Sequence, residues 1–232
     1  MEELTQEAAK IGITISASQQ LLFSQLLTEL KAWNEHTNLT AIREDSAIIK
    51  KHFLDSLSVL SAIPKDTKTL VDIGAGAGFP GLPLAIMNPN IQITLVESVA
   101  KKVAFIEHAI KTLDLKNAIV INARAEELSR NADFRDTFDV ATARAVAELS
   151  TLVEYTLPFV RAGGVFIAQK KAGTEETMLA ETAIKTLSGS ITTSIPITIA
   201  DLEPRQLILI SKIKNTPKEF PRAFGLPSRK PL

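Results

Sequence analysis

A glycine-rich stretch that directly follows a short apolar segment constrains the fold of this chain more than any other feature. Residues 69–73, Thr-Leu-Val-Asp-Ile, are mostly apolar or β-branched, as is typical of a strand covered on both faces. Gly74, Gly76 and Gly78 follow, so the backbone can adopt positive φ and pass close to a ligand. Pro80 suits an early position of a helix. A strand, a glycine turn and a helix in this order form the crevice in which α/β folds bind nucleotides.

The chain after residue 66 alternates between strand and helix patterns. The predicted strands are Thr69–Ile73, Gln92–Glu97, Ala118–Asn122, Phe138–Thr142, Val165–Gln169, Ile195–Ile199 and Leu207–Lys212. The predicted helical segments are Leu82–Met87, Lys101–Leu113, Ala125–Arg130, Ala147–Phe159 and Glu175–Leu187. Such alternation predicts an α/β fold with a mostly parallel seven-stranded sheet and helices on both of its faces. We expect the last two strands to form an antiparallel edge.

Residues 1–65 have a different, wholly helical pattern. Ser16 and Gln19 form a capping-box pattern, and apolar residues recur at helical spacing after it. A second helix is expected over Asp45–Ser61. We therefore predict an N-terminal helical cap over residues 1–65 and a nucleotide-binding domain with a basic C-terminal tail over residues 66–232.

Composition excludes several kinds of protein and site. Apolar residues make up 45% of the chain and charged residues 22%, an ordinary globular balance. No apolar run approaches the ~18 residues that a membrane span needs. No cysteine is present, and the three histidines lack metal-ligand spacing, so we predict no metal site and no thiol nucleophile. The acidic start, Met-Glu-Glu, differs from a signal peptide. We expect a cytoplasmic monomer that makes no membrane contact.

The net charge is zero, but the basic residues are unevenly distributed. Residues 205–232 hold seven basic side chains against one acidic residue, Glu219, a net charge of +6. Such a tail is typical of a phosphate-contacting patch on a nucleic-acid-binding protein. A solubilising, poorly ordered terminus would show the same composition. Charge alone leaves both interpretations open.

The glycine loop satisfies two ligand-binding patterns. Gly76-x-Gly78-x-x-Gly81 matches the dinucleotide fingerprint, which is weakly specific when it stands alone. A tighter spacing begins at Gly74 and is preceded by Asp72 inside the strand. This second arrangement resembles the S-adenosylmethionine loop of class I methyltransferases.

Polar residues at the ends of the other strands add to this site. Glu97 ends the second strand, where a carboxylate can accept ribose hydroxyls of either cofactor. Ala125 and Glu126 follow the third strand, beside the expected adenine position, and Arg144 follows the fourth, where methyltransferases place the acceptor. The chain has no Tyr-x-x-x-Lys pair of the kind used by a large class of dehydrogenases.

A second group of polar residues lies in the N-terminal cap. His52, Asp55 and Ser56 fall at i, i+3 and i+4, so they share one face of a helix. A Ser-His-Asp hydrolase site is a poor interpretation, because it requires convergence of separate elements and an oxyanion hole. This face would instead cover the cofactor, contact RNA, or hold structural polar residues.

Several motifs together resemble the RsmG (GidB) family along nearly the whole chain. They are Asp72–Ala85, Leu95–Ser98 with Lys101-Lys102, Arg124–Glu126, Ala143–Ala147, Trp33-Asn34, Asn38–Thr40, His52–Leu57, and Phe220–Arg222 with Gly225, Pro227 and Lys230–Leu232. The chain departs from the family pattern at three positions. Lys102 stands in place of arginine, Phe220 stands in place of tyrosine, and Ala172 resembles a one-residue insertion. The last of these leaves open whether Lys170 or Lys171 contacts RNA.

The resemblance implies a class I, Rossmann-like methyltransferase that uses S-adenosylmethionine. It implies methylation of guanosine N7 in small-subunit (16S) ribosomal RNA, by direct in-line transfer without a covalent intermediate. The acceptor would be the RNA or the small ribosomal subunit. The implied cofactor-binding residues are Gly74, Gly76, Phe79, Glu97, Ala125, Glu126 and Arg144, the last of which would also position the acceptor. The candidate RNA-binding residues are His52, Arg124, Lys170, Arg205 and Arg222.

The residues permit this chemistry. Guanine N7 carries an unprotonated lone pair, so the enzyme needs no general base and acts mainly by positioning. Absence of cysteine excludes the thiol-addition route to pyrimidine C5 methylation. Aromatic residues are only 5% of the chain, which favours recognition of RNA shape and one extruded base over broad stacking.

Three alternatives remain open from sequence. The first is a nicotinamide-dependent oxidoreductase on the same fold, the second a non-catalytic RNA-binding protein that keeps the fold. The third is a methyltransferase that acts on a small molecule or a protein.

Overall fold

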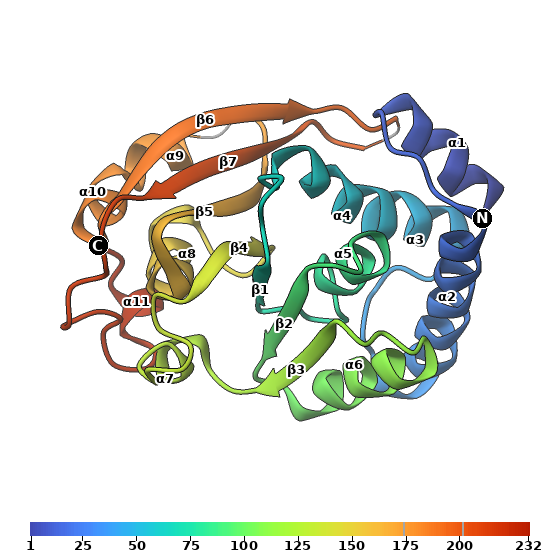
Figure 1. The fold of residues 1–232 in the computed structure, drawn as a ribbon, viewed down its shortest axis with the longest axis horizontal. Coiled ribbons are helices and arrows are strands. Elements are labelled where there is room, and N and C mark those ends of the chain that lie inside the picture. The colour runs from blue at the N-terminus through green and yellow to red at the C-terminus, as the bar shows by residue number, and fades with distance from the viewer. Residues whose placement is uncertain (174, 201) are drawn as a thin grey trace.

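A computed structural model describes residues 1–173, 175–200 and 202–232. Within these residues the strands form a seven-stranded sheet in the order β3-β2-β1-β4-β5-β7-β6 (Figure 1). The strands are β1 (Thr69–Ile73), β2 (Gln92–Glu97), β3 (Ala118–Asn122), β4 (Phe138–Arg144), β5 (Val160–Lys171), β6 (Gly189–Ile197) and β7 (Arg205–Lys212). The pairs from β3 to β5 are parallel, whereas β7 pairs antiparallel with both β5 and β6. The predicted α/β class with an antiparallel edge is therefore confirmed.

Helices cover both faces of this sheet. They are α1 (Glu2–Lys10), α2 (Ala17–Thr37), α3 (Asp45–Ile48), α4 (Asp55–Leu57), α5 (Gly81–Met87), α6 (Ala100–Thr112), α7 (Ala125–Leu128), α8 (Leu149–Thr156), α9 (Glu176–Leu179), α10 (Glu181–Thr186) and α11 (Leu226–Arg229). Short 3₁₀-helices span Ser58–Ala62 and Leu157–Phe159, and a π-helical segment spans Ile49–Leu54.

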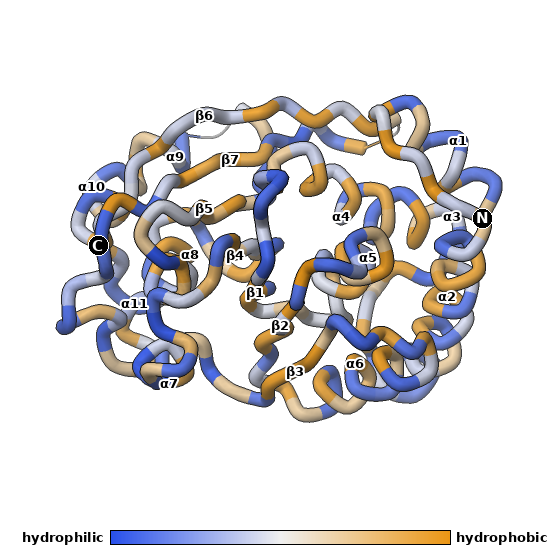
Figure 2. The backbone as a smooth tube through the Cα atoms, viewed as in Figure 1, coloured by the Kyte–Doolittle hydropathy of each residue, from blue (hydrophilic) through white to orange (hydrophobic). Residues whose placement is uncertain are grey.

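Strand alternation divides the core into two clusters, one on each face of the sheet. Leu70 of β1 points to the cluster that contains α2, α5 and α6, and its neighbour Val71 points to the cluster that contains α8 and α10. The central strands are buried on both faces, as their nearly continuous apolar sequences require. Figure 2 shows the hydrophobic residues along the central strand β2.

The N-terminal helices pack directly onto one face of the sheet. The Trp33 ring of α2 lies edge-on to Phe105 of α6, with centroids 5.8 Å apart. Phe53 lies 5.9 Å from Phe79, which belongs to the glycine loop. The capping box of Ser16 and Gln19 is present as predicted. Residues 1–65 thus share one hydrophobic core with α5 and α6, and a domain boundary at residue 65 stays a prediction.

Several predicted elements have different bounds or helix types in the structure. The helix expected over Asp45–Ser61 is a succession of α-, π-, α- and 3₁₀-helical segments. The helix expected over Glu175–Leu187 is divided at Ala180, which is fully buried between α9 and α10. Strand β6 begins at Gly189 rather than Ile195, because Gly189 is already paired with Lys212 of β7.

The basic tail is folded against the body of the protein. Lys212 is fully buried, and its ammonium group donates to Asp136 (2.9 Å) and to Thr216 (2.7 Å). The Arg135 guanidinium donates to the carbonyls of Thr216, Pro217 and Phe220. These contacts direct residues 213–232 back toward α7 and α8, where α11 packs against α8 (Figure 1).

Candidate functional site

The turn after β1 is shaped by its glycines. Gly74, Gly76 and Gly78 have φ values of 69°, 62° and 84°, a region that side chains other than glycine rarely adopt. A Cβ atom on Gly74 would lie 2.6 Å from a methyl of Val146, so that position also requires close packing. A Cβ on Gly76 would meet nothing nearer than 4.0 Å, so Gly76 faces open space. The loop thus forms an open cradle after the first strand.

Glu97 fixes this loop from the end of β2. One carboxylate oxygen accepts the Gly76 N–H at 2.8 Å, and the other accepts the N–H groups of Ser98 and Val99, both at 2.8 Å. A carboxylate offers about four lone-pair positions, so one acceptor position is left for a ligand hydroxyl. Glu97 therefore holds the loop and also presents an acceptor beside it.

Asp72 is a further acidic residue at the site, and it is fully buried. One of its oxygens accepts the Gly81 N–H at the start of α5 (2.8 Å), whereas the other has no partner within the described residues. Burial raises the pKa of Asp72 to about 7, which the Gly81 hydrogen bond and the charge of Arg144 oppose and Glu97 reinforces. An unpartnered buried acceptor of this kind fits a cationic or donor group of a ligand.

A cavity of about 300 Å³ opens beside Gly74 and Glu97. The carboxyl ends of β1 and β2 and the start of α7 line one side, including the predicted residues Ala125 and Glu126. The C-terminal tail lines the other side through Phe224, Gly225 and Ser228. This lining of apolar and polar groups is typical of a small-molecule site.

The lining also contains residues that were not predicted as site residues, among them Val146, Tyr155, Phe224 and Ser228. Burial, the largest effect, raises the pKa of Tyr155, and the nearby Ser228 side chain opposes this shift. The sequence signal for the tail side of the cavity was the motif around Gly225. In the structure the Gly225 N–H donates to the Glu126 carboxylate at 3.3 Å. Composition alone could not show that the tail returns to the sheet.

Arg144, at the end of β4, lies in a polar cluster at the edge of the loop. Its Nη1 donates to the Lys51 carbonyl (2.9 Å) and to the Asp55 carboxylate (2.8 Å). Its Nη2 lies 3.1 Å from Nδ1 of His52. The guanidinium also lies over the Phe79 ring, 5.6 Å from the centroid. The structure thus brings together three predicted residues, Arg144, His52 and Phe79.

The imidazole of His52 is held neutral. It stacks on Phe79 with a centroid distance of 4.6 Å and an interplanar angle of 6°. Burial and, next, the charge of Arg144 lower the pKa of His52 to about 3. A neutral ring with both nitrogens engaged cannot serve as a general base at physiological pH.

Two predicted RNA-binding residues have partners inside the protein. Arg222 makes a two-pronged ion pair with Glu154, which is fully buried, with the shortest distance 2.7 Å. Lys170 forms an ion pair with Glu176 and donates to the Ala147 carbonyl at 2.7 Å. Arg222 thus anchors the C-terminal tail to α8, and Lys170 of β5 anchors the loop after β4. Both segments lie next to the site.

The remaining cationic candidates are more accessible. Arg124 lines the cavity and lies over the Phe224 ring, 4.9 Å from its centroid. The Arg205 side chain is 30% exposed and lies 3.8 Å from Asp55. Lys171 is 62% exposed, in an ion pair with Glu203, whereas the Lys170 side chain is 10% exposed. Of the two lysines, Lys171 is the one that a large ligand can reach.

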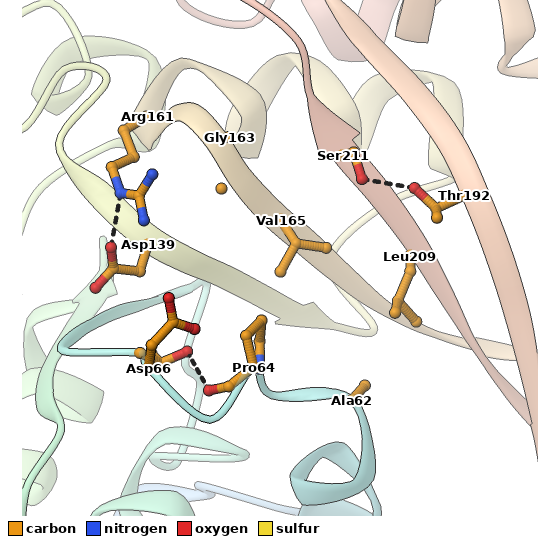
Figure 3. Close-up of a pocket in the computed structure, with 12 residues that line it drawn as sticks. Ala62, Pro64, Asp66, Asp139, Arg161, Gly163, Val165, Thr192, Leu209 and Ser211 are labelled. Atoms are coloured by element: carbon orange, nitrogen blue, oxygen red, sulfur yellow. Dashed lines mark hydrogen bonds and ion pairs between the residues drawn. The ribbon is translucent and has the colours of Figure 1, made fainter.

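A second cavity of about 270 Å³ lies at the opposite, amino end of the sheet (Figure 3). Its lining includes Pro64, Asp139, Arg161 and Leu209, and Arg161 forms an ion pair with Asp139 at 2.7 Å. None of the predicted site residues lines it. The carboxyl end of the sheet is therefore the candidate functional site, as the rule for open α/β sheets predicts.

Comparison with known sequences identifies the family. The family model described as "GidB: rRNA small subunit methyltransferase G" matches residues 19–208. The chain belongs to the GidB family. A relative named Ribosomal RNA small subunit methyltransferase G, from Roseiflexus castenholzii, is 45% identical over the full length of both chains. One of the same name from Clostridium botulinum (strain Eklund 17B / Type B) is 44% identical over 97% of this chain and 95% of its own.

Solved structures with a similar fold include two cofactor-bound proteins of low sequence identity. M. jannaschii TYW2 in complex with AdoMet has a TM-score of 0.56 at 16% identity, covering 75% of this chain and 79% of its own. Cofactor-bound Rv0187 from MTB has a TM-score of 0.58 at 14% identity, covering 82% and 91%. At this identity the likeness shows the fold alone.

Membership in the GidB family confirms three predictions from sequence. The chain is a class I methyltransferase in fold, it uses S-adenosylmethionine, and it is an enzyme that methylates small-subunit ribosomal RNA. The nicotinamide and non-catalytic alternatives are thereby set aside. In the part of the chain that the structure describes, no helix is long and apolar enough to cross a membrane.

Proposed function

We propose that this GidB protein methylates N7 of a guanosine in small-subunit ribosomal RNA by direct in-line transfer. The observation that supports this proposal is the fixed guanidinium of Arg144 at the rim of the glycine loop. Within the described residues its Nε–H and one Nη2–H have no protein acceptor, so one edge of the guanidinium can donate to a ligand. Guanine O6 is an acceptor suited to that edge.

The cavity beside the loop fits S-adenosylmethionine. Gly76 faces open space, Glu97 retains an acceptor position for a ribose hydroxyl, and Asp72 has an unpartnered carboxylate oxygen for a cationic group. Ala125 and Glu126 line the far part of the cavity, where we propose that adenine binds. When bound, this cofactor supplies an electrophilic methyl group on a sulfonium centre.

The protein's own groups then position the acceptor. Guanine N7 forms the new N–C bond with its lone pair as the S–C bond breaks, which leaves a neutral thioether and a cationic methylguanine. No proton moves, so the reaction requires no base, consistent with a neutral His52 whose nitrogens are both engaged. The work of the enzyme is alignment of two bound groups, to which the donor edge of Arg144 contributes.

We further propose that the accessible cations guide the RNA. Arg124 lines the cavity, and Arg205 lies beside Asp55, the ion-pair partner of Arg144. Lys171 takes the place of Lys170 as the candidate phosphate contact. Arg222 and Lys170 would act indirectly, by holding the tail and the loop after β4. We propose small-subunit ribosomal RNA or the small ribosomal subunit as the acceptor. We also propose that the protein is a monomer in the cytoplasm.

Substitution of Arg144 tests this proposal. We expect Arg144→Lys, which keeps the charge but loses the planar fork, to lower kcat on small-subunit particles by about tenfold to a hundredfold. The affinity for S-adenosylhomocysteine should change much less. The readout is labelled-methyl incorporation followed by mapping of N7-methylguanosine, with Arg161→Lys, at the opposite end of the sheet, as the matched control. Full activity of Arg144→Lys, or methylation at a position other than guanine N7, would refute the proposal.

A further inference from the structure

Both ring nitrogens of His52 are engaged within the protein. Nδ1 lies 3.1 Å from Nη2 of Arg144, and an arginine nitrogen can only donate, so Nδ1 is the acceptor. The proton of the neutral ring therefore lies on Nε2, which is 2.9 Å from the hydroxyl oxygen of Thr40. This hydrogen-bond network assigns a single tautomer to His52.

Thr40 is itself fixed by the end of helix α2. The Asn34 side chain accepts the Thr40 N–H and donates to the Thr40 carbonyl, both at 2.9 Å. The Thr40 hydroxyl also accepts the Ile42 N–H at 3.1 Å. Asn34 is 4% exposed, so this anchor lies inside the N-terminal cap. The acceptor of the His52 proton is thus held at a defined place by residues of the cap.

The backbone near His52 supports the same cluster. His52 lies in the π-helical segment Ile49–Leu54, and the carbonyl of Lys51, its neighbour, accepts from Nη1 of Arg144. Asp55, one residue after that segment, supplies the ion pair. π-Helical segments occur frequently at functional sites, where they re-aim side chains and backbone groups. All three acceptors for Arg144 therefore come from one short stretch of the cap.

We propose that His52 is a positioning residue: by accepting from Nη2 of Arg144 through Nδ1, it directs the free edge of the guanidinium toward the acceptor guanine. The Thr40 hydroxyl keeps Nδ1 unprotonated, because its oxygen accepts a hydrogen bond from Nε2–H and so holds the proton on Nε2. Phe79 holds the plane of the ring through stacking. This role differs from direct RNA contact, which we predicted for His52 from sequence. It depends on the proposed function of Arg144.

A pair of substitutions separates the two nitrogens of the ring. In His52→Asn the side-chain oxygen can replace Nδ1 as the acceptor for Arg144. In His52→Gln the amide lies near the former Nε2 and leaves Arg144 without that acceptor. We expect His52→Asn to keep kcat on small-subunit particles within about threefold and His52→Gln to lower it about tenfold or more. The affinity of both for S-adenosylhomocysteine should stay within about twofold of wild type.

A second pair of substitutions, at Thr40, tests the tautomer of His52. This pair still tests the inference if His52→Gln does not fold. Thr40→Val removes the acceptor of the Nε2 proton, so the proton can move to Nδ1 and oppose Arg144. Thr40→Ser keeps the hydroxyl. We expect Thr40→Val to lower kcat about as much as His52→Gln does, whereas Thr40→Ser should keep kcat close to the wild-type value.

The outcomes distinguish this inference from its alternatives. Equal loss of kcat in His52→Asn and His52→Gln, or equal rates in the two Thr40 variants, would overturn the positioning role. A salt-dependent rise in KM for the RNA with unchanged kcat would overturn it in favour of phosphate contact. Full activity of Arg144→Ala would instead refute the proposed function on which the inference depends.

Discussion

At the scale of the residue, the buried carboxyl of Asp72 ties stability to cofactor binding. Its one hydrogen-bond donor is Gly81, and its second oxygen has no partner within the described residues. Ionisation of a buried carboxyl without a cation costs free energy of folding, which a positively charged ligand can offset. The ionised form of Asp72 should therefore be more stable in the cofactor-bound protein than in the free protein.

This carboxyl predicts a pH dependence of stability in the free protein. Burial raises the pKa of Asp72 from 3.8 in the unfolded chain to about 7 in the folded protein. The folded state then holds a proton that the unfolded state releases, so the contribution of Asp72 to stability is lost as pH rises from about 4 to about 7.

Asp72→Asn removes this titration. Between pH 4.5 and pH 8, we expect the wild-type protein to lose about 2–4 kcal/mol more of its free energy of unfolding than Asp72→Asn loses. Urea unfolding of both proteins at the two pH values measures it, and comparison of the two cancels the other titrating groups. Parallel pH profiles would contradict the assignment. The variant should also bind S-adenosylmethionine more weakly.

At the scale of the element, the C-terminal tail forms one wall of the cofactor cavity. Phe224, Gly225 and Ser228 line that wall, and the ion pair of Arg222 with the buried Glu154 fixes the tail just before them. Removal of one partner from a buried pair leaves an uncompensated charge. The tail therefore links a structural ion pair to the site.

We expect Arg222→Ala to lower the free energy of unfolding by about 3–5 kcal/mol and to weaken binding of S-adenosylhomocysteine. Lys230→Ala is the control, because Lys230 is exposed and lies in the same tail. It should change stability by less than about 0.5 kcal/mol. Thermal unfolding and calorimetry measure the two effects. Unchanged affinity in a folded Arg222→Ala protein would show that the tail is not part of the site.

At the scale of the whole molecule, local patterns predicted what depends on local physics. The β1 strand and the glycine turn follow from β-branched residues, glycines and a proline that each act within a few positions. Parallel strands end at one edge of a sheet, so Glu97 and Arg144 could be placed at the same crevice from their positions alone.

Contacts between distant segments could not be predicted in this way. The i, i+3, i+4 spacing put His52 and Asp55 on one helix face, but their partner Arg144 lies 92 and 89 positions further along the chain. The π-helical turn that joins them has no distinctive residue pattern. The inward position of Arg222 likewise depends on Glu154, an acidic residue buried in a helix that the sequence shows as merely amphipathic.

We propose that one cavity, enclosed by the glycine loop, the ends of β1 and β2 and the C-terminal tail, holds the methyl donor beside Arg144. A crystal structure with S-adenosylhomocysteine tests it most directly. We expect the ribose within hydrogen-bond distance of Glu97 and the adenine against Ala125 and Glu126. The thioether sulfur should lie on the side of the loop that faces Arg144. Density for the ligand at any other place, including the cavity at the amino end of the sheet, would contradict it.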